Sequence, residues 1–226
     1  MATTSGRAAG GRYAGRSAEE RRAERRTRLM DAGLALFGTR GYGATTIRDV
    51  CSHARLAERY FQESFGSREQ LLLAVYDRAI EETVAAIAAD TAAVAAAATG
   101  DPDPETVLRA GIAAAFRALT ADEPRARVQL LEVVGVSATV DERWQAAMRT
   151  VATLVERLML EYAPPLAALP ATLRHDTGTM LVGGIHRRLI DWFLARDREP
   201  LDEVVDRVTA ISLATLRGLA VRYAPR

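Results

Sequence analysis

Apolar residues recur every three to four positions along most of this sequence, which is the spacing of one face of an α-helix. One such stripe runs through residues 18–38 and comprises Leu29, Gly33, Leu36 and Phe37. Alternation with a period of two, typical of a half-buried β-strand, is not evident anywhere in the chain. The pattern therefore predicts an all-α fold.

A second apolar stripe follows a glycine-rich turn and comprises Ile47, Val50, Cys51 and Ala54. Either Thr45 or Thr46 can cap a helix that begins there, because a threonine hydroxyl accepts a hydrogen bond from a free backbone amide. Ser17, with a glutamate three residues later, predicts a capping box for the first helix, and Ser67 caps a long fourth helix. The remaining spacing predicts helices over about 57–65, 67–98, 104–121, 124–135, 140–162, 171–196 and 200–223, which makes about nine in all.

Charge is distributed unevenly, although the net charge of the chain is only +1. Residues 1–77 contain 13 arginines against 9 acidic residues, whereas residues 78–226 contain 17 arginines against 20 acidic residues. Every basic residue other than histidine is arginine. A basic first third on a mildly acidic remainder favours a polyanionic partner for that third, although chance gives the same modest asymmetry.

Composition narrows the class of protein further. The chain is 49% hydrophobic and 26% charged, as in ordinary globular proteins. We expect no membrane span, because no apolar stretch approaches the roughly 18 residues that one requires, and no signal peptide. The single cysteine, Cys51, cannot form an internal disulfide, so we expect a cytoplasmic location and interpret its thiol as a small buried side chain.

The two short helices predicted over 45–65, packed on a longer first helix, form the pattern of a helix-turn-helix. The apolar positions Ile47, Val50, Phe61 and Phe65 make its inner face. An α-helix fits the major groove of DNA, where arginine suits guanine, glutamine suits adenine and glutamate can accept from cytosine. A plain helical hairpin inside a larger bundle would use the same apolar positions.

The segment from Phe37 to Val50, FGTRGYGATTIRDV, resembles the turn and second helix of the TetR family of repressors. The segment from Ala54 to Leu72, ARLAERYFQESFGSREQLL, resembles the recognition helix of that family and the start of its fourth helix. The resemblance covers about residues 19–77. It implies a DNA-binding domain over 18–66 and a helical ligand-sensing and dimerisation domain over 67–226, whereas the composition of residues 1–17 predicts a disordered basic tail.

The resemblance also implies roles for matched positions. Thr46 would cap the second helix near a phosphate, Arg48 would meet guanine, and Arg68 would meet a phosphate. The full predicted DNA-contacting set is Thr45, Thr46, Arg48, Arg55, Glu58, Arg59, Tyr60, Gln62 and Arg68. Tyr60, Gln62 and Ser64 depart from the family's common residues, and Ala57 replaces its usual serine cap, so the preferred DNA sequence does not carry over.

The remainder of the resemblance implies a homodimer that binds double-stranded DNA and an unidentified small-molecule effector. Two long C-terminal helices are candidates for the dimer seam, through Leu181, Ile185, Leu189, Trp192, Val204, Val208 and Ile211. An ordinary buried core helix has the same periodicity. Candidates for an effector pocket are Phe116, Gln129, Trp144, Met148 and Met180, whose alternative role is to fill the core or to lie on the surface.

The sequence favours a regulator over other classes of protein. It contains no glycine-rich phosphate loop and no nucleophile motif, so we expect no catalytic residues, no cofactor and no metal site. His175 and His186 have no second histidine or cysteine with ligand spacing. A ligand-responsive repressor is the predicted function, by a shift between dimer conformations. The alternatives are an activator of the same fold and a helical adaptor that does not bind DNA.

Overall fold

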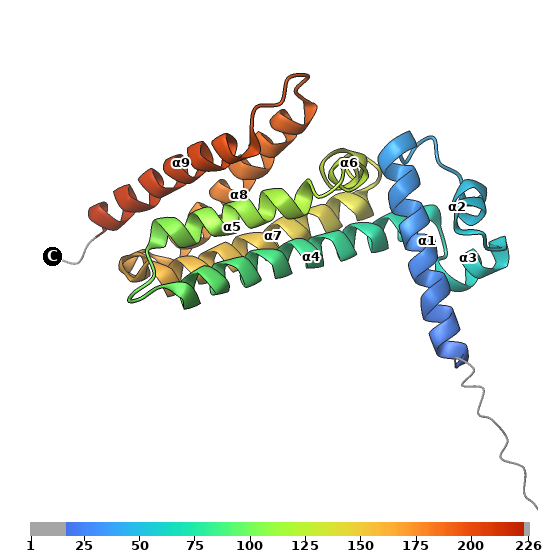
Figure 1. Cartoon of the computed structure of the whole chain (residues 1–226), viewed down its shortest axis with the longest axis horizontal. Coiled ribbons are helices and arrows are strands. Elements are labelled where there is room, and N and C mark those ends of the chain that lie inside the picture. Colours follow the sequence, from blue (N-terminus) through green and yellow to red (C-terminus); the bar gives the residue numbers. More distant parts are fainter. Residues whose placement is uncertain (1–16, 224–226) are drawn as a thin grey trace, which may run out of the picture.

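The computed structural model describes residues 17–223, which form helices and connecting loops without a strand (Figure 1). The nine α-helices of this range are α1 (Ala18–Arg40), α2 (Ile47–Ala54), α3 (Glu58–Ser64), α4 (Arg68–Ala97), α5 (Pro104–Leu119), α6 (Glu123–Arg127), α7 (Ala138–Tyr162), α8 (Ala171–Leu194) and α9 (Leu201–Arg222). The all-α prediction is confirmed. The tail predicted over residues 1–17 lies outside the described residues, apart from Ser17.

The helix starts follow the capping residues that the sequence offers. The Ser17 hydroxyl accepts a hydrogen bond from the Glu20 amide at 3.0 Å, and the Ser17 amide donates to the Glu20 carboxylate at 2.6 Å, which completes the predicted capping box. The Ser67 hydroxyl accepts from the Gln70 amide at the start of α4. Each cap satisfies an amide that the first helical turn leaves without a backbone partner.

The helix predicted over 124–135 is wrong in one respect. Regular α-helix ends at Arg127, and a π-helical turn, Val128–Glu132, takes its place. Val128, Gln129 and Leu130 are buried in succession, and only the end of the turn, Leu131 and Glu132, is partly exposed. The sequence pattern of an amphipathic α-helix, with one buried and one exposed face, therefore could not predict this π-helical turn.

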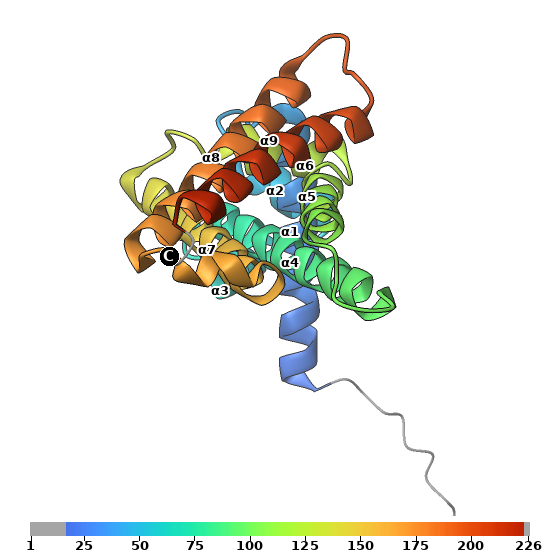
Figure 2. The same ribbon diagram turned by 90° about the vertical axis from the view of Figure 1, so that its left-hand side faces the viewer.

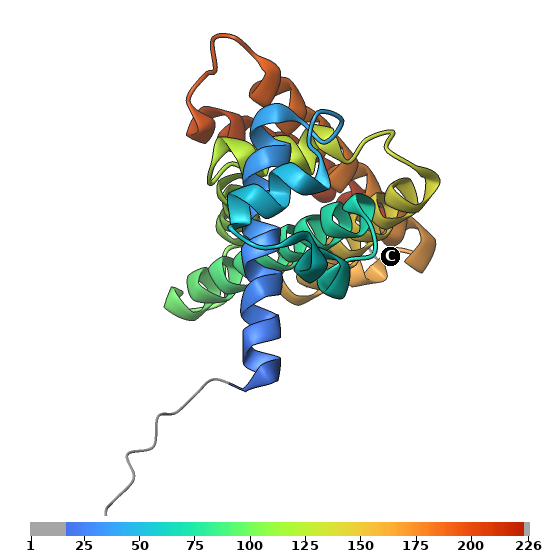
Figure 3. The same ribbon diagram turned by 90° about the vertical axis from the view of Figure 1, so that its right-hand side faces the viewer.

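Helices α1, α2 and α3 form a compact unit at one end of the molecule (Figure 1), and Figure 3 looks onto α2 and α3. Their shared core contains Phe37, Val50 and Phe61, together with Leu72 and Tyr76 of α4. The long helix α4 continues from this unit into the body formed by α5 to α9. One helix therefore belongs to both parts of the molecule.

A second junction joins α1 to the body. A Cβ atom added to Gly38, near the end of α1, would lie 2.3 Å from the Cα atom of Pro124 in α6. Only glycine allows the backbones of the two helices to approach this closely. The N-terminal unit is thus fixed to the body through α6 as well as through α4.

The body has two sides. Figures 1 and 2 show α4 on the opposite side from α8 and α9, with α5 and α7 between them. A core cluster that includes Phe116, Leu189 and Val204 joins α5, α8 and α9 at the end near α6. Within the described residues, no helix is long and apolar enough to span a membrane.

Candidate nucleic-acid interface and ligand cavity

The second helix is held at its start by a complete capping box. The Thr46 hydroxyl accepts from the Asp49 amide at 3.1 Å, and the Asp49 carboxylate accepts from the Thr46 amide at 2.9 Å. Hydrogen bonds from Thr46 lower the pKa of Asp49, with smaller contributions from nearby arginines. Val50 and Cys51 face the core, and burial raises the pKa of the Cys51 thiol. This packing leaves Thr46 and Arg48 exposed on the outer side of α2.

The structure places Thr45 in the interior, away from the position expected for a DNA contact. Its side chain is fully buried, and its hydroxyl donates to the Gly41 carbonyl at 2.8 Å. Gly41 has a φ of 92°, which favours glycine, and it begins the turn in which Thr45, four residues later, points inward. Of the two threonines, Thr46 is the one that caps the helix.

The third helix presents most of the predicted DNA-contacting side chains to solvent. Phe61 is fully buried and fixes the helix on α1, whereas Glu58, Arg59 and Gln62 are exposed. Ala57 stands at its N-cap without a side-chain hydrogen bond, as the sequence indicates. Arg55, also exposed, occupies the turn between α2 and α3 with a φ of 53°. The exposed groups on α2 and α3 thus form one surface, which includes two helices and their turn.

Three arginines of α1 hold this surface in place, a feature that the sequence analysis missed. The Arg25 guanidinium lies 4.5 Å from the ring centroid of Tyr60, and that of Arg26 lies 4.2 Å from Phe65. Arg28 donates to the Ala54 carbonyl at 2.5 Å, at the end of α2. The run of arginines in α1 was the available signal, but helical spacing alone does not give their partners.

Two of the predicted contacts also have structural partners. Tyr60 is half-buried, and its hydroxyl accepts from Arg59 at 2.9 Å. Arg68 donates to the Thr45 carbonyl, and its guanidinium lies 4.2 Å from the ring centroid of Tyr42. Arg68 therefore ties the start of α4 to the turn before α2. Its charge remains beside the helix-turn-helix surface.

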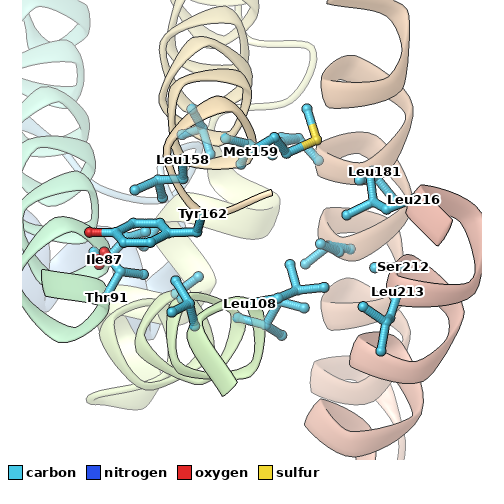
Figure 4. Close-up of a pocket in the computed structure, with 18 of the residues that line it drawn as sticks. Ile87, Thr91, Leu108, Leu158, Met159, Tyr162, Leu181, Ser212, Leu213 and Leu216 are labelled. Atoms are coloured by element: carbon cyan, nitrogen blue, oxygen red, sulfur yellow. Dashed lines mark hydrogen bonds between the residues drawn. The ribbon is translucent and has the colours of Figure 1, made fainter. Parts of the chain in front are cut away.

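The body contains a partly open cavity of about 330 Å³. Figure 4 shows side chains of α4, α5 and α7 facing those of α8 and α9 across it, among them Ile87, Leu108, Met159 and Leu216. Nearly all of the lining is hydrocarbon. Two charged residues line it: Asp103, in the loop that leads into α5, and Arg217, on α9. Such a cavity suits a molecule with a large apolar part.

The predicted pocket residues divide into two groups. Gln129 and Met148 line the cavity. Phe116 does not, because it is fully buried in the core between α5, α8 and α9. Trp144 lies against the N-terminal core and contacts His186 with its ring edge, and Met180 is 77% exposed on the outer side of α8. Tyr76 and His186, which line the cavity from α4 and α8, were not among the predicted pocket residues.

The predicted dimer residues divide in a similar way. Leu189, Val204 and Val208 are buried within the single chain, and Trp192 is half-buried with its indole donating to the Glu199 carbonyl. Leu181, Ile185 and Leu189 line the cavity. Ile211 alone of the set is strongly exposed, at 67%. Other exposed apolar side chains on these helices are Met180, Leu194 and Val221. The stripe chosen from the sequence is therefore mainly the inner face.

A hydrogen bond connects the cavity region with the helix-turn-helix. The Tyr42 amide, in the turn before α2, donates to the Glu132 carboxylate at 2.7 Å. Arg127 donates to the other oxygen of the same carboxylate at 2.8 Å. Glu132 ends the π-helical turn that also contains the cavity residue Gln129. A movement of this turn would act directly on the segment before α2.

Comparison with known proteins agrees with this geometry. Residues 29–75 match the family model described as bacterial regulatory proteins, tetR family. The fatty acid degradation regulator FadR of Bacillus halodurans has a similar fold, with a TM-score of 0.71 and 18% identity, over 85% of this chain and 96% of that protein. No curated protein sequence matches the chain significantly.

Two further structures share the fold at low identity. FadR from Bacillus subtilis, in complex with stearoyl-CoA, has a TM-score of 0.71 and 14% identity, over 83% of this chain and 97% of its own. A TetR/AcrR family regulator of Thermobifida fusca has a TM-score of 0.61 and 19% identity, over 84% of this chain and 97% of its own. The chain therefore shares the overall fold of these structures. The match to the tetR family model is confined to residues 29–75, the segment that contains α2 and α3.

Proposed function

We propose that this protein is a ligand-responsive transcriptional repressor that binds a palindromic operator as a homodimer. The observation that carries the proposal is the exposed set on α2 and α3, which includes Arg48, Arg59 and Gln62 and is supported from behind by α1. Arg48 makes no hydrogen bond or ion pair within the described residues, so its guanidinium can meet a base edge. Binding to DNA implies a cytoplasmic location.

Dimerisation follows from the geometry of DNA. One helix-turn-helix contacts only a few base pairs, whereas a two-fold dimer contacts two half-sites about one helical turn apart. The exposed apolar side chains Met180, Leu194, Ile211 and Val221 lie on α8 and α9, and they support an interface on the outer face of these helices. Gly183 and Gly184 are exposed on the same helix as Met180 and would allow close approach.

A charge placed in this face tests the dimer. Ile211→Arg should convert the dimer to a monomer in light scattering after size exclusion, because an unpaired charge would be buried in an apolar seam. Val134→Arg is the matched control, since Val134 is 63% exposed but lies outside α8 and α9. An Ile211→Arg protein that remains dimeric would place the interface elsewhere.

The effector follows from the cavity. Its apolar lining supports a molecule with a long hydrocarbon part, and a neighbour in fold, FadR from Bacillus subtilis, was solved with stearoyl-CoA. Binding would favour a conformation in which the two recognition helices no longer fit adjacent major grooves. The bond between Glu132 and Tyr42 offers the physical connection, because it joins the π-helical turn to the turn before α2.

Capture of genomic DNA fragments by the purified protein tests the proposal. We expect the enriched fragments to share an inverted repeat, and Arg48→Ala to lose the enrichment. Arg149→Ala is the matched control, because Arg149 is equally an exposed arginine but lies on α7. Absence of enrichment at low salt, where phosphate contacts are strongest, would refute DNA binding.

A further inference from the structure

The apolar cavity contains buried polar groups without partners. The Tyr76 hydroxyl and both the oxygen and the nitrogen of the Gln129 amide have no hydrogen-bond partner among the described residues. Tyr76 is 1% exposed and Gln129 is 2% exposed, and both line the cavity. A buried polar group without a partner costs free energy, so a native protein normally supplies a partner for each. Because these groups line the cavity, a molecule bound in the cavity can supply the missing hydrogen-bond partners.

These groups belong to the end of the cavity nearest the helix-turn-helix. Tyr76 is part of the same core as Phe37 and Phe61, and Gln129 follows Val128 of that core. His186 lines the cavity too and contacts Trp144, which packs on the same core. The opposite end is formed by the start of α5 and the end of α7. Its residues include Pro104 and Tyr162.

The chemistry of this end is uncharged. Burial raises the pKa of the Tyr76 hydroxyl, so it stays protonated. Burial also lowers the pKa of His186, which favours its neutral form. The charged residues that line the cavity, Asp103 and Arg217, are those of the opposite end. No cation of residues 17–223 lines the inner end, and the nearby Arg143 guanidinium is already paired with Asp77, so a carboxylate or a phosphate there would be desolvated with little compensation.

We propose that the inner end of the cavity binds an uncharged hydroxyl-type group of the effector through Gln129 and Tyr76, while its hydrocarbon part extends toward Tyr162. A hydroxyl matches Gln129 because it both donates and accepts a hydrogen bond, and the amide needs a partner for its oxygen and for its nitrogen. A ketone oxygen can only accept, and a hydrocarbon does neither. The inference rests on the proposed effector cavity and specifies its ligand class.

The position of Gln129 gives the bound hydroxyl a role. Gln129 lies in the same π-helical turn as Glu132, whose carboxylate accepts a hydrogen bond from the Tyr42 amide. A hydrogen bond to Gln129 is thus formed one turn of helix from the contact with the helix-turn-helix. Hydrocarbon alone would fill the cavity without engaging this turn.

Four probes with eight carbons test the proposal: 1-octanol, 2-octanone, octanoate and octane, each measured by displacement of a fluorescent apolar dye from the full-length protein. We expect 1-octanol to bind most tightly. Gln129→Met and Tyr76→Phe keep the side-chain volume and remove the polar atoms, and each should weaken 1-octanol roughly tenfold while octane changes less than about twofold. Thermal unfolding of both variants checks that they fold.

Thr91→Val is the matched control. Thr91 lines the same cavity, but its hydroxyl already donates to the Ile87 carbonyl at 2.8 Å, so its removal should leave 1-octanol affinity unchanged. Equal affinity for all four probes, tightest binding of octanoate, or 1-octanol binding that ignores both substitutions would overturn the proposal.

Mobility shifts with a captured operator, run on the same preparations, separate this inference from the proposed function. An operator-binding protein that shows no preference for 1-octanol contradicts the inference alone. A protein that shows the preference but binds no DNA contradicts the proposed function alone.

Discussion

The two regions that share α4 differ in how their interiors are filled. In the N-terminal unit, Phe37, Phe61 and Leu72 pack together with no exposed area. In the body, α4 and α5 face α8 and α9 across a cavity of about 330 Å³. Close packing maximises stability and fixes side chains, whereas a cavity forfeits contacts that a ligand can restore. Under the proposed function, the closely packed unit is the part that contacts DNA, and the cavity of the body is the part that a ligand would fill.

The largest effect is expected from a cavity made in the packed region. Phe61→Ala should destabilise the protein by about 3–5 kcal/mol, because the fully buried ring anchors α3 on the N-terminal core. Urea unfolding measures this, and Gln62→Ala, on the exposed side of the same helix, should change stability by less than about 0.5 kcal/mol. A small effect of Phe61→Ala would mean that this core is not closely packed.

A matched pair of enlargements compares the two interiors directly. Ala32 is 2% exposed in the N-terminal core, so Ala32→Leu should cost about 1–3 kcal/mol through overpacking. Ala115 lines the cavity, where additional methyl groups find space, so Ala115→Leu should leave stability unchanged or raise it by up to about 1 kcal/mol. Equal losses for both variants in thermal unfolding would remove the contrast.

A smaller effect is expected at the cap of α2. Thr46→Ala should destabilise the protein by about 1 kcal/mol, because the Asp49 amide loses the hydroxyl that accepts its hydrogen bond and the Asp49 carboxylate loses the hydroxyl that donates to it. Thr45→Ser is a useful companion, since it keeps the buried hydroxyl that donates to Gly41. If Thr46→Ala unfolds at the same urea concentration as the unaltered protein, the capping box adds nothing to stability.

The smallest effect is the pH dependence of that cap. Hydrogen bonds from Thr46 lower the pKa of Asp49 below its ordinary 3.8, so the folded state binds this proton less readily than the unfolded state. The stabilisation is therefore complete above the unfolded pKa and is lost as pH falls through the folded value. The difference between the unaltered protein and Thr46→Ala should be constant near neutral pH and narrow below about pH 4. A gap that widens in acid would contradict this sign.

The N-terminal unit could be predicted from the sequence because its signals are local. Thr46 directly precedes the apolar stripe of α2, and Phe61 and Phe65 lie one turn apart, so spacing alone indicates their roles. Local spacing did not distinguish Thr45 from Thr46, because the inward turn at Gly41 decides which threonine is buried. The tail over residues 1–17 and the division into domains remain predictions.

The body could be predicted only as helices. Periodicity identified apolar faces on α8 and α9, but not which neighbour covers them. Val204 and Val208, predicted at the dimer seam, are buried within the chain, whereas Met180, predicted in the pocket, is exposed. The cavity depends on how five helices are placed around it, and its polar residues Tyr76 and His186 come from segments far apart in the chain. Gln129 and Met148 were found because their residue types suit a pocket.

The central claim, that the α2–α3 surface binds operator DNA, is tested most directly by affinity for a captured operator at increasing salt. The account predicts that the logarithm of affinity falls steeply and linearly with the logarithm of salt concentration, since phosphate contacts release counterions. It also predicts that Arg48→Ala loses about 1–3 kcal/mol at that operator, while Arg149→Ala loses nothing. Affinity that is insensitive to salt and equal in both variants would contradict the claim.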